Sequence, residues 1–259
     1  MRRRDLLGAM AMCGLLVACG DESGSSGMTK KGYFFPAHRF RLTAEVETPE
    51  GVRRGSSVIQ VRWSISSYEI NGEAAAVDLP GGQTLFVLLR SKAQESADWA
   101  GLASSWIPQN LKDSWVLPNA ENSASSIAKG KYYWGHVARY RGTVPVPRLR
   151  KMPWGEIDNY PYFVKFKDIR DPGSVELVDP DNFAASFGTG YRLKSLTATF
   201  TAEPVTHIIN SRLGWLAEVG RTRATLQKVP RYDPKAAEVP VLTPTQRISP
   251  SDFSRNLYK

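Results

Sequence analysis

The stretch Phe40-Arg41-Leu42-Thr43-Ala44-Glu45-Val46-Glu47 alternates apolar and polar residues, and the turn sequence Thr48-Pro49-Glu50-Gly51 follows it. Proline presets φ inside such a turn, and glycine can adopt φ > 0 at its end. Beyond the turn, a second alternating stretch places four apolar residues on one face: Ile59, Val61, Trp63 and Ile65. A period of two on both sides of a turn predicts an antiparallel hairpin with one buried face.

Other stretches extend this hairpin into a larger β structure. Residues 84–90 are apolar on both faces, which is typical of a central strand covered on two sides. Shorter strands are predicted at residues 74–79, 162–167, 175–178 and 191–201. We therefore expect a mainly β (α+β) fold, an antiparallel sheet or sandwich with two or three short helices.

Helical spacing appears at three places. In residues 93–106 it puts Trp99 and Trp106 on one apolar stripe, which favours core packing for both rings. A short helix is expected within residues 181–188, closed by Gly188. A third helix, capped by Thr206, would present the apolar residues Ile208, Ile209, Leu213 and Leu216.

Residues 1–18 have the three parts of an export signal. Three arginines (Arg2, Arg3 and Arg4) precede an apolar run at residues 6–17, which is too short to span a bilayer. The block Leu16-Val17-Ala18-Cys19 resembles the bacterial lipobox. That resemblance implies a lipoprotein signal peptide at residues 1–18, cleavage before Cys19, and acylation of Cys19 by palmitate-type chains. The alternatives left open are an ordinary cleaved signal and a twin-arginine export signal.

The rest of the chain suggests a simple organisation. Residues 19–32 have the composition of a flexible tether, and residues 33–220 are predicted to form one mostly β domain. Residues 221–259 are basic and rich in proline, and we expect an extended segment packed on the domain and pinned by Ile248 and Phe253. Anchored in this way, the protein would lie in the cell envelope, on a membrane, facing the periplasm.

Charge and cysteine content restrict the partners. The net charge is +9, and the first 18 residues hold three arginines and one aspartate, so about +7 remains after cleavage. This charge favours an anionic lipid, a glycan or an envelope protein as partner, and the predicted location argues against nucleic acid. The cysteines are Cys13 and Cys19, so the domain is expected to have no disulfide.

An aromatic and basic region at residues 132–154 is the candidate ligand-contact region. Its candidate residues are Tyr132, Tyr133, Trp134, His136, Arg139 and Arg141. Such side chains can stack on sugar rings or hold anionic head groups. The alternative is a loop-rich edge whose rings cover the sheet. Residues 119–131 are small and polar and predict a surface loop, and prolines at residues 145, 147 and 153 argue against a long helix.

No catalytic or metal motif stands out. The carboxylates Asp168, Asp171, Asp179 and Asp181 fit turns and caps better than a calcium loop, which needs a closing acidic ligand. The three histidines are solitary in sequence, and nucleophile-elbow, Walker and dinucleotide patterns are absent. We therefore predict no cofactor and no metal.

Two stretches resemble an uncharacterised group of small exported proteins in Gram-negative bacteria. The first includes residues 40–51, 56–59 and 77–82, and the second runs from residue 175 to residue 206. The group has no known activity, so the resemblance implies no functional residue. We therefore expect a lipid-anchored envelope protein with a non-enzymatic binding or structural role towards an anionic envelope component. The alternative is an envelope hydrolase with a site assembled from distant residues and His136 or His207 as base.

Overall fold

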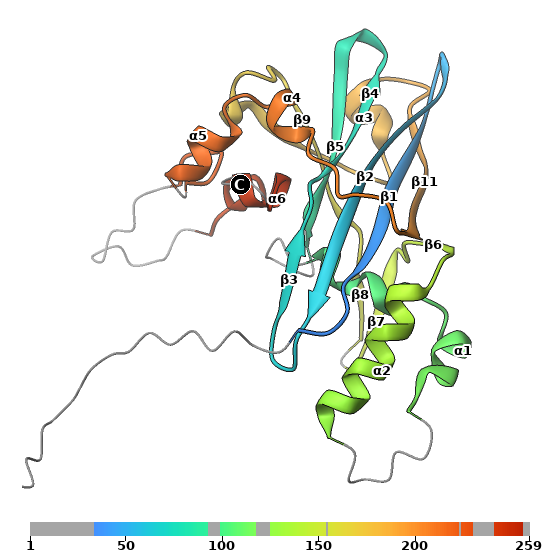
Figure 1. The fold of residues 1–259 in the computed structure, drawn as a ribbon. Helices are drawn as coiled ribbons and strands as arrows, with labels where there is room; N and C mark the ends of the chain where they lie inside the picture. Colours follow the sequence, from blue (N-terminus) through green and yellow to red (C-terminus); the bar gives the residue numbers. More distant parts are fainter. Residues whose placement is uncertain are drawn as a thin grey trace, which may run out of the picture. The chain divides into compact units, whose positions relative to one another are not determined.

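The computed structural model describes residues 34–92, 99–117, 125–153, 155–222, 224–229 and 241–255. The chain forms two units, Met1–Gly32 and Tyr33–Lys259, and every described residue belongs to the second. The predicted signal, Cys19 and the predicted tether lie outside the described residues. The fold is mainly β, with antiparallel sheets and short helices, which confirms the predicted class (Figure 1).

The first sheet has five strands in the order β3-β2-β1-β11-β6. These strands are β1 (His38–Thr48), β2 (Gly51–Trp63), β3 (Tyr68–Asn71), β6 (Thr143–Pro145) and β11 (Arg192–Thr201). Strand β1 alternates buried and half-buried residues throughout, and it pairs with β2 and β11. The hairpin prediction is confirmed, but Ile65 was misplaced: it lies in the turn after β2 and is 59% exposed.

The second sheet has four strands in the order β10-β9-β5-β4. They are β4 (Ala75–Leu79), β5 (Gln83–Ser91), β9 (Pro161–Phe166) and β10 (Val175–Val178). As predicted, β5 is a central strand covered on both faces. A separate hairpin joins β7 (Leu149–Met152) and β8 (Gly155–Asp158).

Two apolar cores hold the layers together. The larger contains side chains from both sheets, and the smaller lies between β5, β9 and the C-terminal helices. Close approach explains one glycine: a Cβ on Gly55 of β2 would sit 1.9 Å from the carbonyl oxygen of Ala76 in β4. The sheets are therefore in direct backbone contact along this edge.

Several short helical segments follow the predictions. The 3₁₀ helix η2 (Trp99–Trp106) buries both of its tryptophans, while the preceding residues 93–98 lie outside the described ranges. Helix α3 (Phe183–Phe187) begins at Asn182, whose side chain accepts from the Ala185 amide, and ends at Gly188 with φ +103°. Single 3₁₀ turns also occur at η1 (Pro80–Gly82) and η4 (Pro172–Ser174).

The prediction of a surface loop at residues 119–131 is wrong for residues 126–131, which are helical. Residues 119–124 lie outside the described ranges. Helix α2 (Ser126–Arg139) occupies this stretch, after α1 (Gln109–Lys112) and η3 (Asp113–Trp115). Two glycines, Gly130 and Gly135, lower its intrinsic helix propensity. Packing of Trp134 and Val137 against the large core offsets that weakness, so a tertiary contact decides the helix.

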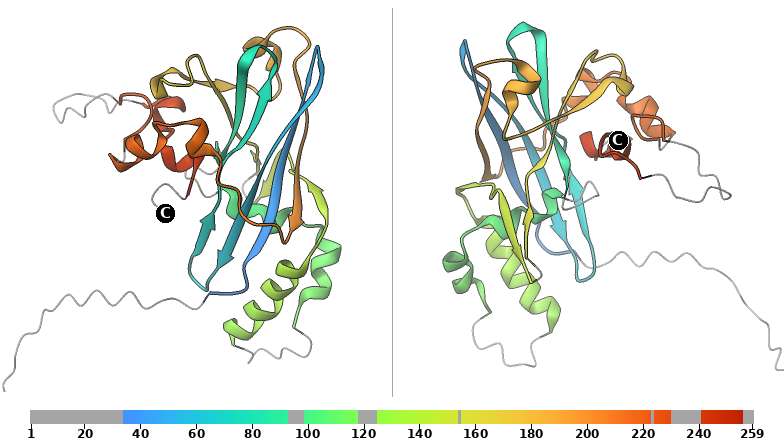
Figure 2. Two further views of the ribbon diagram at one scale, coloured as in Figure 1. Left: turned by 45° about the horizontal axis from the view of Figure 1, so that its top comes forward. Right: turned by 180° about the vertical axis from the view of Figure 1, so that it is seen from behind.

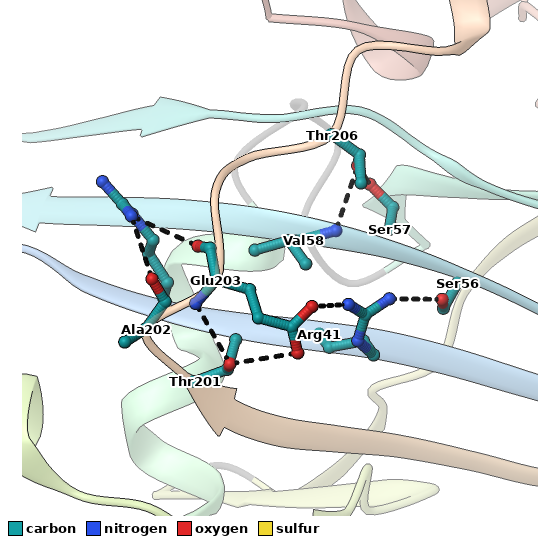
Figure 3. A network of polar contacts seen from close by, with 9 residues as sticks. Arg41, Ser56, Ser57, Val58, Thr201, Ala202, Glu203 and Thr206 are labelled. Carbon is teal, nitrogen blue, oxygen red and sulfur yellow. Dashed lines mark hydrogen bonds and ion pairs between the residues drawn. The ribbon is translucent and has the colours of Figure 1, made fainter.

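The predicted helix after Pro204 is divided into α4 (Ile209–Arg212) and α5 (Leu216–Arg221), and Thr206 does not cap it. Figure 3 shows Thr206 beside β2 instead, where its Oγ1 accepts from the Val58 amide at 3.0 Å. Glu203 in the same crossing segment pairs with Arg41 of β1. The crossing therefore ties the C-terminal helices to the first sheet.

The C-terminal part contains helical turns where an extended segment was expected. They are η5 (Thr245–Arg247) and α6 (Pro250–Phe253). Ile248 and Phe253 are fully buried, as predicted. Within the described ranges, no helix has both the length and the apolar character that a membrane span requires.

Candidate functional site

Helix α2 lies at the end of the first sheet where β1 begins and β2 ends (Figures 1 and 2). Its first turn is capped by Ser125, whose hydroxyl accepts from the Ala128 amide at 3.2 Å. A Cβ on Gly130 would meet the Phe35 ring at 2.3 Å, so this glycine lets the helix lie directly on the start of the domain. The Ser125 cap thus fixes where α2 begins, and the close contact of Gly130 with Phe35 fixes where it lies on the domain.

A stack of rings lies beneath α2. Trp134 is nearly parallel to His38 of β1, with ring centroids 5.7 Å apart, and to Trp63 of β2, at 5.3 Å. His38 also lies on Phe200 of β11. One helix side chain therefore packs on rings from both strands of the hairpin, which stabilises α2 through ring contacts.

Several polar nitrogens in this end of the core have no hydrogen-bond partner among the described residues. They are both ring nitrogens of His38 and the indole nitrogens of Trp63 and Trp106. Leaving a buried donor or acceptor unpaired costs about 1–3 kcal/mol. Burial also lowers the pKa of His38 to about 4, so this ring is neutral at neutral pH.

The outer surface of α2 differs from its base. Lys129, Lys131 and Arg139 are exposed on it, and Arg141 lies two residues beyond the last residue of the helix. Residues 109–117 and 125–141 together hold five basic residues and one acidic residue: Lys112, Lys129, Lys131, Arg139, Arg141 and Asp113. We call residues 109–117 and 125–141, together with the β2–β3 turn at residues 64–67, the α2 end. Its described part carries a net charge of 5 − 1 = +4.

Exposed apolar side chains accompany this charge. Ile65 lies in the β2–β3 turn, Leu111 in α1, Val116 just after η3 and Ile127 in the first turn of α2, and all four are exposed. Lone exposed apolar residues are common on proteins. Four exposed apolar side chains at one end, interleaved with basic residues, are instead typical of a protein surface that binds where water meets an apolar phase.

The structure divides the predicted ligand-contact residues into two groups. Trp134 packs inward, and Tyr133 packs on Trp134 and Trp115, where burial raises the pKa of its hydroxyl. Tyr132 and His136 contact each other one turn apart, at 4.7 Å. The basic pair, Arg139 and Arg141, points outward, although Arg141 also donates to the carbonyls of Ala138 and Tyr140.

Sequence reasoning missed His38 and Trp115. His38 continues the alternation of Phe40 and Leu42 by one more step towards the start of β1, and that signal could have placed it in the core. Trp115 lies in a one-turn helix without periodicity, and it meets His136 and Tyr133 only through the fold. No sequence signal could have revealed that contact.

The histidines give the hydrolase hypothesis no positive support. His38 is buried, and within the described part of the chain neither of its nitrogens has a hydrogen-bond partner, while His136 stacks on Trp115 at 5.8 Å. His207 is exposed. A general base needs a hydrogen bond to the group it deprotonates and another that orients it. The contacts described for His38 and His136 are ring contacts.

The acidic cluster forms turns, as predicted. Asp171 accepts from the Gly173 amide and Asp179 from the Asp181 amide, both at 2.9 Å. Asp168 pairs with Arg170. Among the described residues, no group of three or more metal-binding side chains is arranged to hold an ion.

Three hollows lie elsewhere on the domain. One of about 500 Å³ lies between the β4–β5 turn and residues 167–170. A second of similar size lies on the outer face of the first sheet, where Arg41 and Arg54 are paired with Glu203 and Glu45. In the third, of about 280 Å³, Arg148 is held by Asp158 and Asp181. The arginines of the second and third hollows have carboxylate partners, and the α2 end combines its basic residues with four exposed apolar side chains, so we take the α2 end as the stronger candidate for binding an anionic surface.

No family model, curated protein or solved structure matches this chain. The lipobox and the resemblance to exported proteins therefore remain predictions from the sequence.

Proposed function

We propose that the protein is a lipid-anchored cell-envelope protein whose α2 end binds an anionic envelope component without catalysing a reaction. The observation that carries this proposal is the composition of the α2 end, where five basic residues and one acidic residue surround exposed apolar side chains. Lysine and arginine attract phosphate and carboxylate groups, and apolar neighbours add contact area. Acylation of Cys19 would hold this surface in the envelope.

The anchor is tested by replacing each cysteine in turn. In cells given an alkyne fatty acid, Cys19→Ser should lose acyl labelling and accumulate as precursor or soluble protein. Cys13→Ser is the matched control, because it removes the other cysteine and should leave labelling and membrane fractionation unchanged. Unaltered labelling of the Cys19→Ser protein would refute the anchor.

The binding surface is tested with two charge-reversal pairs that change net charge equally. Lys129→Glu with Lys131→Glu alters α2, and Arg221→Glu with Lys228→Glu alters exposed positions of the C-terminal part. Each basic residue near an anionic membrane surface contributes about 1 kcal/mol. The α2 pair should therefore weaken binding to phosphatidylglycerol vesicles by about 30-fold at low salt, using the chain from residue 19 with Cys19→Ser.

The control pair should have a much smaller effect, because it shares only the change in net charge. Binding by the unaltered chain should also fall steeply from low to physiological salt. Equal losses for the two pairs, or a flat salt response, would contradict a binding role for the α2 end.

A further inference from the structure

We infer that the anionic component is the headgroup layer of the same bilayer that holds the acylated Cys19, with the α2 end lying against it. This inference rests on the proposed function and adds a partner and an orientation to it. Three observations carry it: the place where the chain enters the domain, the length of chain before that place, and the side chains that surround it.

The chain enters the domain inside the α2 end. Phe34 forms an isolated antiparallel bridge with Ser64 in the β2–β3 turn. The Phe35 amide donates to the Trp63 carbonyl at 2.7 Å, and the Phe35 ring lies against Gly130 of α2. The guanidinium of Arg62 lies 4.5 Å from the centre of the Phe34 ring. Any anchor upstream therefore pulls on the domain beside α2 and the β2–β3 turn.

The chain between the anchor and this point is short. Cys19 and Phe34 are 15 residues apart, a distance that covalent geometry limits to about 50 Å. The Gly- and Ser-rich composition predicts a typical separation of about 20 Å. Strand β1 has 11 residues and spans about 36 Å, so the turn after β1 lies much farther from the anchor point. The α2 end is thus the end of the domain held near the bilayer.

The side chains at this end suit a headgroup layer. Lys129 and Lys131 are exposed on α2, next to the exposed Ile127, and Ile65 is exposed in the turn beside Phe34. Basic residues are attracted to lipid phosphates, and apolar side chains gain from shallow insertion among the acyl chains. A soluble polyanion would use the charges alone and would leave the isoleucines in water. The mixed surface therefore favours lipid over a free phosphate polymer.

Single introduced cysteines can test the orientation, because Cys19 would be acylated and Cys13 removed. Ile127→Cys probes α2, and Ile169→Cys is the matched control. Both isoleucines are similarly exposed, at 37% and 40%. Ile169 lines a hollow with Gly81 and Gly82 of the β4–β5 turn. Strand β5 spans about 30 Å, and it runs from that turn to the end of the domain where Gly101 of η2 lies next to Tyr68. Each acylated protein is labelled with bimane and reconstituted into vesicles of phosphatidylethanolamine and phosphatidylglycerol.

Bimane at residue 127 should shift to the blue and lose emission to a nitroxide-labelled lipid, and bimane at residue 169 should do neither. Adding Lys129→Glu and Lys131→Glu should abolish the effect at residue 127 while the protein stays on the vesicles. Equal responses from the two labels would overturn the orientation and leave the anchor intact. Protein that does not stay on the vesicles would instead overturn the proposed function.

Discussion

Helix α2 and the C-terminal helices both cover the β sheets, but different chemistry holds them in place. The ring of Trp134 fixes α2 by stacking on His38 and Trp63, and several nitrogens in that end of the core lack hydrogen-bond partners among the residues that the structure describes. The C-terminal helices pack on the smaller apolar core, and buried charges that bond to backbone groups also fix them.

Two buried carboxylates show how the C-terminal helices are held. Glu73 is 1% exposed and accepts from the amides of Ile208 and Ile209 at 2.6 and 3.0 Å, which fixes the start of α4. Asp252 in α6 accepts from the Ser249 amide at 2.8 Å. It also lies 3.4 Å from Arg90 of β5. Burial raises the pKa of Asp252, so its charged state depends on these partners.

The charged residues of the two regions have different surroundings. Buried charges in the C-terminal helices are committed to hydrogen bonds within the fold, although the Nε of Arg90 is unpaired among the described residues. The basic residues Lys129 and Arg139 lie on the outer surface of α2, while the rings under it and the buried Val137 hold its inner surface. We therefore expect mutations of the buried charges at the C-terminal helices to lower stability, and mutations of the exposed basic residues of α2 to weaken binding.

The largest expected effect comes from breaking the buried pair. Arg90→Met leaves Asp252 buried without its cationic neighbour, which should lower the free energy of unfolding by about 3–5 kcal/mol. The matched control is Arg212→Met, which removes the more exposed pair between Arg212 and Asp78 and should cost less than about 1 kcal/mol. Urea unfolding followed by circular dichroism measures both values. Equal losses would mean that the buried pair does not fix the C-terminal helices.

Trp63→Ala should reduce the free energy of unfolding by about 3 kcal/mol, because it removes the ring on which Trp134 stacks. Trp63→Phe keeps a ring there and removes an indole nitrogen that has no partner among the described residues, so it should cost less than about 1.5 kcal/mol. A melting temperature of the alanine variant close to that of the unaltered protein would show that α2 is held by something other than this stack.

A smaller effect should appear as a pH dependence of stability. The pKa of His38 falls from 6.5 to about 4 on burial. The folded-state pKa lies below the unfolded value, so the contribution of His38 is full above pH 6.5 and is lost as the pH falls towards 4. Between about pH 7 and pH 4.5 the loss should be roughly 2 kcal/mol.

His38→Phe should remove this component. The raised pKa of Asp252 acts in the opposite direction as the pH falls, but it is common to both proteins and cancels in the comparison. Urea midpoints measured across this pH range provide the test. An unchanged pH profile in the phenylalanine variant would contradict the assignment of a buried, neutral His38.

The sequence could predict the strands because their patterns are local. The alternation in residues 40–47 and the apolar run before Arg90 each identify a strand through the two faces of a sheet. Helix α2 could not be predicted in this way, because Gly130 and Gly135 weaken its propensity and contacts with distant rings decide it. Glu73 illustrates the same limit, since its carboxylate bonds to amides 135 and 136 residues away.

The candidate site was predictable only as a composition. The aromatic and basic residues between residues 132 and 141 were visible in the sequence, but their division into inner rings and outer charges depends on the orientation of α2. The exposed Ile65 and the place where Phe34 enters belong to the same end only in the folded domain. Such juxtapositions are long-range consequences of the hairpin register.

Amide hydrogen exchange of the acylated protein tests the difference between the two covers most directly. It is measured in vesicles with phosphatidylglycerol and in vesicles of phosphatidylcholine alone, peptide by peptide. We predict slower exchange in α2 (Ser126–Arg139) and at residues 109–117 in the anionic vesicles, and equal exchange in α6 (Pro250–Phe253) in both. Exchange in α2 that does not respond to lipid charge, or an equal response in α6, would contradict the account.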